Sequence, residues 1–363
     1  MSGTSLDGVD GVLADLSQPT MRVLCHRSAP FPDDLRQTLF QLNTSGTDEL
    51  HRAALAANAL VRVYADVVTA LLEAGHCHKS DVCAVGAHGQ TVRHQPQLFD
   101  GTGYTLQLNQ PALLAEMCGI DVVADFRSRD VAAGGQGAPL VPPFHQALYG
   151  HLEGTTGVLN IGGISNITLL NAEAPGSVIG FDCGPGNALM DAWCHAHTGA
   201  VFDDGGQWAA GGAVQAELLE SFLSEPFFAQ APPKSTGRDL FNGPWLQTHL
   251  RPFAHLAPQH VQTTLTELTA RACADSLHLF APQCARLIVC GGGALNGYLM
   301  HRLQSHLGNC RVESSAAFGL PPLQMEAAAF AWLARQCVER KTASLKSVTG
   351  AQGARILGAI YAA

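Results

Sequence analysis

The chain has 363 residues, a length that favours two domains of roughly 150 to 200 residues over one core. Hydrophobic residues make up 47% of it, charged residues 14%, and 38 residues are glycine, a composition typical of a packed α/β protein and not of a disordered one. Twenty-one Lys and Arg against 30 Asp and Glu give a net charge of −9 without a basic block, which argues against nucleic acid or an anionic membrane and favours a small-molecule partner.

The first third of the chain alternates strand-like and helical patterns. A glycine turn at Gly3 precedes strand-like runs at 9–15 and 21–26, a long helical stretch, a strand at 82–87, a helix from 111 and a strand at 121–126. A similar order of strands and helices recurs from residue 156. There the pattern predicts a strand at 158–161, a glycine turn, strands at 167–170 and 178–182, helices near 187 and at 263–279, a strand at 287–290, a helix from 295, a strand at 310–313 and a last helix from about 323.

Two copies of one element order predict two α/β halves that face each other. We expect residues 1–127 plus about 340–363 to form the first half and residues 128–339 the second, with a nucleotide in the cleft between them. The first glycine turn has no strand before it, because Met1 adjoins it directly, whereas the apolar run 158–161 precedes the second turn. We therefore expect a few further residues before Met1.

Glycine turns at equivalent places in both halves predict phosphate binding. Backbone N–H groups, hydroxyls and carboxylates gather in the first turn, and its Asp-Gly pair is also typical of an ordinary hairpin. The second turn has Gly162 and Gly163, and the coincidence of the two turns favours phosphate. The first turn consists of Gly3, Thr4, Ser5, Leu6, Asp7, Gly8, Val9 and Asp10.

A third glycine run, Gly291, Gly292 and Gly293, ends a strand and opens a helix near Asn296. Without side chains, such a turn lets an adenosine lie against the backbone, although three glycines can also form a close-packing corner. Asp182 ends a buried strand just before a glycine-proline turn, where a carboxylate can serve as general base or can cap the turn.

Polar side chains at other strand ends suit a sugar. Arg127 and Arg129 follow Asp125 at a strand exit, where arginine forks could bind a carboxylate or join a salt-bridge network between the halves. Gln90 follows His88 and Gly89 and could bind hydroxyls or cap. Glu326 starts an apolar helix, where it could favour the helix dipole or project into the cleft.

Eleven cysteines without a repeating spacing, several inside apolar runs, favour a reducing cytoplasm. The N-terminal residues lack the pattern of a signal peptide. The clusters around residues 76–78 and 191–197 resemble metal ligands but have no second ligand pair at a recognised spacing, so no directly bound metal is expected.

Several of these motifs, in this order, resemble the anhydro-N-acetylmuramic acid kinase family along the whole chain. They include the segments 1–10, 88–91, 125–127 with 134–139, 160–163, 182–187 and 233–238. The resemblance implies a duplicated actin/hexokinase-like (ribonuclease H-like) α/β fold with two domains and a central cleft. It also implies ATP and Mg²⁺, with Mg²⁺ held by the ATP phosphates and reached by Asp7 through water.

The reaction implied by the resemblance opens the 1,6-anhydro ring of the sugar and transfers phosphate from ATP to O6, giving N-acetylmuramic acid 6-phosphate in cell-wall recycling. Asp182 would take the proton of the attacking water. Gln107 joins Gln90, Asp125, Arg127, Arg129 and Glu326 as the expected sugar-binding residues. The sugar's lactyl carboxylate gives one of the two arginines its partner.

Two rival hypotheses stay open at the level of sequence. A kinase for another sugar would share the nucleotide turns and differ in its sugar contacts. A nucleotide switch of the actin or chaperone type would close on ATP without chemistry on a sugar. Asp182 and the paired arginines favour a kinase, and a homodimer is one oligomeric state that the sequence leaves open.

Overall fold

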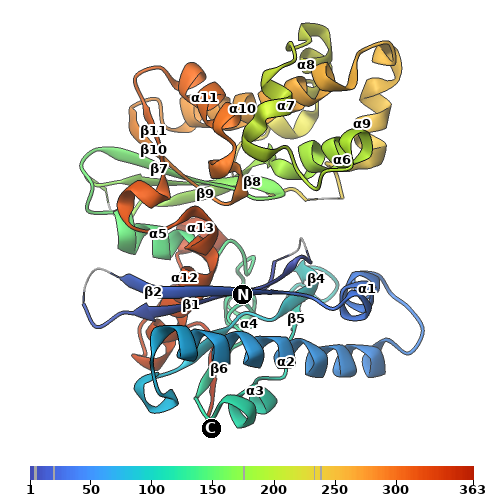
Figure 1. The fold of residues 1–363 in the computed structure, drawn as a ribbon. Coiled ribbons are helices and arrows are strands. Elements are labelled where there is room, and N and C mark those ends of the chain that lie inside the picture. The colour runs from blue at the N-terminus through green and yellow to red at the C-terminus, as the bar shows by residue number, and fades with distance from the viewer. Residues whose placement is uncertain (4–5, 19–20, 175, 233, 238) are drawn as a thin grey trace. The chain divides into compact units, whose positions relative to one another are not determined.

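The computed structural model describes residues 1–3, 6–18, 21–174, 176–232, 234–237 and 239–363. The chain divides into two compact units (Figure 1). Unit 1 comprises Met1–Phe144 and Gln324–Ala363, and unit 2 comprises His145–Leu323. The sequence predicts these limits at residues 127 and about 340 and so assigns the last long helix to the second half. The contacts of that helix lie in unit 1 instead.

Unit 1 is built from short strands around two long helices. Its strands are β1 (Gly8–Asp15), β2 (Arg22–Pro30), β3 (Val85–Ala87), β4 (Gln90–Pro96), β5 (Gly103–Leu108), β6 (Val122–Ala124) and β12 (Ala359–Tyr361). Its helices are α1 (Asp33–Gln41), α2 (Glu49–Gly75), η1 (Lys79–Asp81), α3 (Pro111–Cys118), α4 (Ser128–Ala132), α12 (Met325–Val338) and α13 (Lys346–Thr349), while α5 (Pro142–Tyr149) crosses into unit 2.

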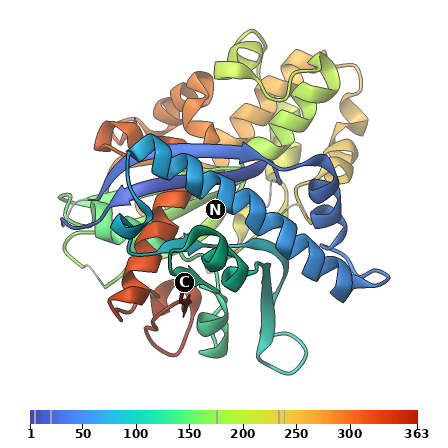
Figure 2. The same cartoon turned by 60° about the horizontal axis from the view of Figure 1, so that its bottom comes forward.

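The strands of unit 1 form separate small sheets. β1 pairs antiparallel with β2, β4 pairs antiparallel with β5, and β6 lies between a parallel β3 and an antiparallel β12. α2 runs across the β1–β2 hairpin (Figure 2) and buries Leu60, Val61 and Tyr64. It is long and apolar enough to cross a membrane, yet half of its most apolar window is buried inside the protein, as in a core helix.

Unit 2 has one larger sheet and most of the remaining helices. The strands are β7 (Thr155–Ile161), β8 (Ile164–Asn171), β9 (Ile179–Pro185), β10 (Cys284–Cys290) and β11 (Arg311–Ser314). The helices are α6 (Asn187–Thr198), η2 (Asp204–Gly206), α7 (Gln207–Ala210), α8 (Ala216–Leu223), η3 (Pro226–Ala229), α9 (Gly243–Leu250), η4 (Arg251–Phe253), α10 (Pro258–Phe280), η5 (Gly292–Leu295), α11 (Gly297–Leu307), η6 (Ser315–Phe318) and η7 (Pro322–Gln324), whose last residue belongs to unit 1.

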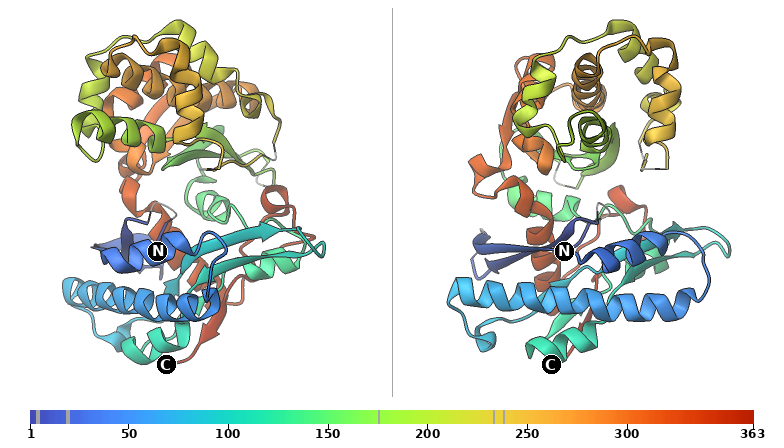
Figure 3. Two further views of the ribbon diagram at one scale, coloured as in Figure 1. Left: turned by 90° about the vertical axis from the view of Figure 1, so that its right-hand side faces the viewer. Right: turned by 45° about the vertical axis from the view of Figure 1, so that its right-hand side comes forward.

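The sheet of unit 2 has the strand order β11-β10-β7-β8-β9. β7, β8 and β9 form an antiparallel meander, and β10 and β11 continue the sheet parallel to β7. Residues 287–290 of β10 form a continuous apolar run, as is typical of a strand between two parallel neighbours in a sheet that helices cover. Helices α6 to α11 gather on one face of this sheet (Figure 3), where α10 packs on β8 and β9.

A three-stranded meander followed by parallel strands is the ribonuclease H-like arrangement, and unit 1 repeats part of it with β1, β2, β3 and β6. The predicted fold class, a duplicated actin/hexokinase-like α/β fold, is therefore confirmed, and the central cleft stays an expectation. The sequence missed the β4–β5 hairpin, whose strands carry too many polar residues to look buried.

Candidate active site

The first glycine turn lies at the start of unit 1. Gly3 accepts a hydrogen bond from Nε2 of Gln90 at 3.0 Å, and Leu6 has a left-handed backbone with φ 60°. A side chain at Gly8 would have its Cβ 2.2 Å from the carbonyl oxygen of Ala29, so the turn closes only with glycine there. The predicted phosphate-binding residues Thr4 and Ser5 lie outside the described residues.

Near this turn, the half-buried Arg127 contacts the buried His88. Arg127 donates from Nε to Nε2 of His88 at 3.0 Å and from Nη1 to the carbonyl of Gly137 at 2.8 Å. Burial lowers the pKa of the Arg127 guanidinium to about 10, while the carboxylate of Glu326 on α12 acts in the opposite direction. Among the described residues, the buried Oε1 of Gln90 finds no hydrogen-bond partner. Arg127 thus contacts His88 and feels the charge of Glu326, while Gln90 contacts Gly3.

Other predicted sugar-binding residues lie apart from that group. Asp125 is exposed and accepts hydrogen bonds from the N–H and Oγ of Ser128 at 3.3 and 2.5 Å. Arg129 is exposed and lines, with Asp125 and other residues, a cavity of about 680 Å³ that does not include Arg127. Gln107 donates to the hydroxyls of Thr91 and Thr105 at 3.2 and 2.8 Å on the β4–β5 hairpin.

The glycine turn after β7 and the turn after β9 lie against each other in unit 2. The N–H of Gly186 donates to the carbonyl of Gly163 at 3.0 Å, and the N–H of Asn187 donates to that of Gly162 at 2.7 Å. A Cβ at Gly186 would lie 2.2 Å from the carbonyl oxygen of Gly162. The two turns therefore form one backbone surface at the start of α6.

The triple-glycine turn completes this surface. Gly291 has φ 77°, and a Cβ there would lie 2.4 Å from Oδ1 of Asn160. A Cβ at Gly293 would lie 2.4 Å from Cγ2 of Ile161. Asn296 caps α11, because its Oδ1 accepts the N–H of Leu299 at 2.9 Å. Close packing thus explains two of the glycines, and the predicted adenosine contact remains a prediction.

Asp182 lies in the middle of β9, because the strand continues to Pro185 and does not end at Asp182 as the sequence predicts, and the residue is partly buried. Burial raises the pKa of this carboxyl to about 6, although the N–H of Thr236, 2.9 Å from Oδ2, and the charge of Lys234 both favour the ionised form. The Thr236 N–H therefore fixes Oδ2, and the described residues give Oδ1 no donor. A carboxylate poised near neutral pH in this way is suited to general base catalysis.

Known proteins resemble the chain over its whole length. The family model for anhydro-N-acetylmuramic acid kinase matches residues 1–363. Proteins named anhydro-N-acetylmuramic acid kinase from Albidiferax ferrireducens and Variovorax paradoxus are 61% and 60% identical, each over 100% of this chain and 98% of the relative. The chain belongs to the anhydro-N-acetylmuramic acid kinase family. Membership makes it a kinase, as the sequence predicts.

Solved structures resemble this kinase only weakly. The activator of 2-hydroxyisocaproyl-CoA dehydratase from Clostridium difficile, solved with ADPNP, has a TM-score of 0.44 and 10% identity, over 90% of this chain and 94% of that one. The assignment of the fold therefore rests on the strand order described above.

Thr236 and Lys234 act on the carboxylate of Asp182, although the sequence predicts no individual role for either residue. Thr236 fixes its carboxylate, and Lys234 lies 8% exposed with Nζ 4.7 Å from the Phe227 ring centroid. Both lie more than 50 positions along the chain, so no local pattern could reveal the contact. The available signal was the segment 233–238, which carried part of the family resemblance.

The residues of the first turn fit the Mg²⁺ that an ATP-dependent kinase uses. Asp7 is exposed beside the turn, whereas Asp10 shares its Oδ1 with Nε2 of His26 at 3.1 Å. No cluster of three or more His, Cys, Asp or Glu suited to a metal occurs among the described residues. One exposed carboxylate fits a cation held mainly by nucleotide phosphates and water.

Proposed function

We propose that this kinase uses ATP to convert 1,6-anhydro-N-acetylmuramic acid to N-acetylmuramic acid 6-phosphate and ADP in the recycling of peptidoglycan in the cytoplasm. One observation carries the mechanism: the Asp182 carboxyl has a pKa of about 6 and is held through one oxygen by the Thr236 N–H. A base with this pKa is largely ionised at neutral pH and can still accept a proton.

The proposed reaction joins two bond changes. Asp182 takes a proton from the water that attacks the anomeric carbon, and the bond between that carbon and O6 breaks. The freed O6 attacks the γ-phosphorus, and the bond from that phosphorus to the ADP oxygen breaks. The leaving O6 therefore receives the phosphoryl group and needs no separate acid.

The glycine turns supply the proposed nucleotide site. Backbone N–H groups of the turns at Gly3 and Gly162 suit phosphate oxygens, and the Gly291 turn suits the adenosine. Mg²⁺ would neutralise developing phosphate charge, with Asp7 positioned to hold one of its waters. We assign nucleotide contacts to both units and place the reaction in a cleft between them.

The sugar contacts in this proposal come from unit 1. Arg127 would bind the lactyl carboxylate, because His88 and the carbonyl of Gly137 fix its half-buried guanidinium, and the unpartnered Oε1 of Gln90 would accept a sugar hydroxyl. Asp125, Arg129 and Gln107 are retained as outer contacts of the sugar. A sugar without a carboxylate would leave Arg127 without this partner.

The test is product analysis by mass spectrometry with Mg²⁺-ATP and the anhydro sugar in ¹⁸O water, beside Asp182→Asn. The proposal expects phosphosugar labelled at the anomeric oxygen and a loss of rate of about 10²-fold or more in the variant. Phosphosugar without label would indicate an ordinary sugar kinase, and slow ATP hydrolysis without phosphosugar would indicate a nucleotide switch.

A further inference from the structure

A cavity of about 680 Å³ in unit 1 is lined by three arginines from three parts of the chain. Arg129 comes from α4, Arg340 follows the end of α12, and Arg355 lies in the segment before β12. Among the described residues that line the cavity, Asp125 is the only carboxylate and none is aromatic. The Oδ1 of Asp125 already accepts hydrogen bonds from Ser128. The lining therefore carries more positive than negative charge.

The protein does not neutralise these arginines. None of the three guanidinium groups forms an ion pair with the residues that the structure describes. The carboxylate next to Arg340 in the chain, Glu339, pairs instead with Arg335 and Lys341, each at 2.7 Å. Three guanidinium groups against one carboxylate give the lining a net charge of +2, in a chain whose net charge is −9. The cavity therefore attracts anions.

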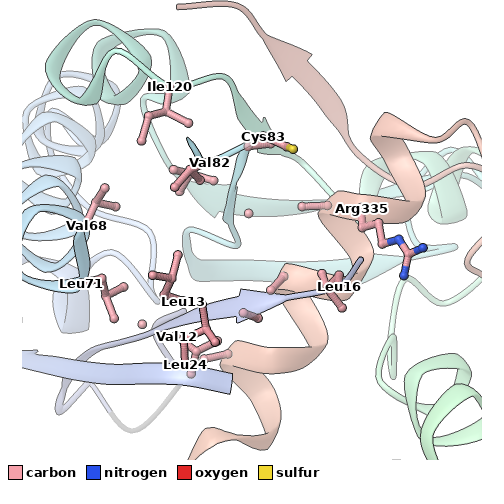
Figure 4. Close-up of a pocket in the computed structure, with 18 of the residues that line it drawn as sticks. Val12, Leu13, Leu16, Leu24, Val68, Leu71, Val82, Cys83, Ile120 and Arg335 are labelled. Carbon is pink, nitrogen blue, oxygen red and sulfur yellow. The ribbon is translucent and has the colours of Figure 1, made fainter. Parts of the chain in front are cut away.

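Another cavity of unit 1 shows that such a lining is not general in this unit. It has a volume of about 640 Å³ and is lined by residues of β1, α2 and α12. Figure 4 shows Leu13, Val68 and Leu71 converging on it, whereas Arg335 directs its guanidinium away from them. An apolar wall gives an anion no compensation for its lost water. The arginine-lined cavity is thus the one suited to a charged ligand.

Backbone hydrogen bonds fix the segments that carry the arginines. The N–H of Arg355 donates to Oγ of Ser344 at 2.9 Å, and its carbonyl accepts the N–H of Ala343 at 2.9 Å. The N–H of Gln352 donates to the carbonyl of Ala133 at the end of α4 at 2.9 Å. The cavity is therefore built on a fixed frame, and a ligand does not have to order the segments that bind it.

Arg340 occupies a backbone position that favours glycine. Its φ is 57°, its N–H donates to the carbonyl of Cys337 at 3.1 Å, and the N–H of Lys341 donates to the carbonyl of Gln336 at 2.8 Å. This is the Schellman arrangement, in which glycine is the usual left-handed residue after a helix. Arginine is less stable than glycine in this conformation, but it places a guanidinium at the cavity.

We propose that this cavity binds a phosphorylated sugar, with its phosphate group held by the three arginines. A phosphomonoester carries a charge of about −1.5 to −2 at neutral pH, and its oxygens accept the paired N–H groups of guanidinium forks. The volume of about 680 Å³ leaves room for a sugar ring beside the phosphate. Asp125, Ser128 and Thr342 offer oxygens to sugar hydroxyls. Without an aromatic ring, the lining offers a nucleotide base nothing to stack on.

The product of the reaction is one such phosphorylated sugar, and this choice among ligands rests on the proposed function. Asp125 and Arg129 would contact the phosphorylated sugar, in competition with their assignment as outer contacts of the substrate. Arg340 and Arg355 have no assigned contact with the substrate. Variants of these two arginines therefore distinguish a separate site from an extension of the substrate site.

The experiment measures binding by calorimetry with N-acetylglucosamine 6-phosphate, N-acetylglucosamine and inorganic phosphate as probes. The phosphorylated sugar should bind at least about tenfold more tightly than either of the other two. Arg340→Asn, which tolerates the left-handed backbone, and Arg355→Gln should each weaken its binding by about tenfold or more. Arg62→Gln is the matched control, because Arg62 is an exposed arginine of α2 that does not line the cavity, and it should leave binding unchanged.

Modification by phenylglyoxal, followed by mass spectrometry, locates the bound probe. N-acetylglucosamine 6-phosphate should slow the modification of Arg340 and Arg355 by about tenfold and should not change that of Arg62. Unchanged affinity in Arg340→Asn and Arg355→Gln would overturn the proposal, and so would equal affinity for the phosphorylated sugar and inorganic phosphate.

Two further results would also overturn it. Tighter binding of ADP than of the phosphorylated sugar, lost in the same two variants, would make the cavity a nucleotide site. A tenfold rise in the KM for the anhydro sugar in these variants would make it part of the substrate site. Since binding is measured without turnover, a chain that fails to phosphorylate the anhydro sugar would contradict the proposed function and would leave this test intact.

Discussion

Asp182 links the chemistry to pH at the scale of one residue. Its pKa is raised to about 6, so the carboxylate is protonated below that pH and cannot accept a proton from water. We expect kcat/KM to fall on the acid side with an apparent pKa of about 6, losing about tenfold per pH unit below it. Steady-state rates between pH 4.5 and 8 test this, with thermal melts at each pH to exclude unfolding.

Lys234 supplies the matched variants, because its charge lowers the pKa of Asp182. Lys234→Met should move the acid limb to higher pH, and Lys234→Arg should leave it near its place. If the acid limb of the pH–rate profile stays at the same pH in Lys234→Met, and Tm is unchanged, the titrating group is not Asp182.

The two arginines near α4 make a second prediction at this scale. Arg127 is half-buried and donates to the buried His88, whereas Arg129 is exposed beside a separate cavity. Arg127→Lys loses the planar fork and should raise the KM for the anhydro sugar by about tenfold or more, with the KM for ATP little changed. Arg129→Lys, measured in parallel, should change the sugar KM by less than about threefold. The reverse order would place the sugar carboxylate at Arg129.

At the scale of elements, the Gly291 turn joins β10 to η5 under tight steric limits. Gly291 has φ 77°, and a Cβ would meet Asn160 at 2.4 Å and the carbonyl oxygen of Ile161 at 2.6 Å. Gly291→Ala should cost about 1–3 kcal/mol of stability and lower Tm by several degrees, at about 2–4 °C per kcal/mol. Since the turn is proposed to contact adenosine, the KM for ATP should rise as well.

Gly243→Ala is the control for this turn, because nothing lies within 4 Å of a Cβ at Gly243 and the residue opens α9. Calorimetry and ATP titration of both variants separate the two effects. If Gly291→Ala lowers Tm but does not change the KM for ATP, the turn contributes to packing and does not contact the nucleotide.

The five strands of unit 2 could be predicted along the chain, because they include apolar runs such as 287–290, whereas their order in the sheet comes from the structure. The β4–β5 hairpin could not, since its residues, such as Arg93 and Gln95, are mostly polar. The order of elements along the chain also could not predict that α12 packs in unit 1, because α12 follows the strands of unit 2. Within the site, the spacing of Arg127 and Arg129 could not predict that Arg127 contacts His88 while Arg129 is exposed, because His88 lies 39 positions earlier in the chain.

At the scale of the whole molecule, the proposed catalytic groups are divided between two units. Arg127, Gln90 and Glu326 belong to unit 1 and Asp182 belongs to unit 2, so the proposal requires one substrate to contact both units, and we expect the units to close on it. The chain passes between the units twice, near residues 144 and 323, which leaves few covalent constraints on such a motion. Closure would also exclude bulk water from ATP while one water reaches the anomeric carbon.

Small-angle scattering of Asp182→Asn tests closure, because this variant should hold ATP and the anhydro sugar together without turnover. The radius of gyration should fall when both ligands are present. It should fall less with ATP alone, because the sugar contacts that we assign to unit 1 do not form without the sugar. Gln90→Ala in the same background should reduce the additional compaction that the sugar causes. An equal radius with and without both ligands would show that the units do not close, and the division of the site between them would then be wrong.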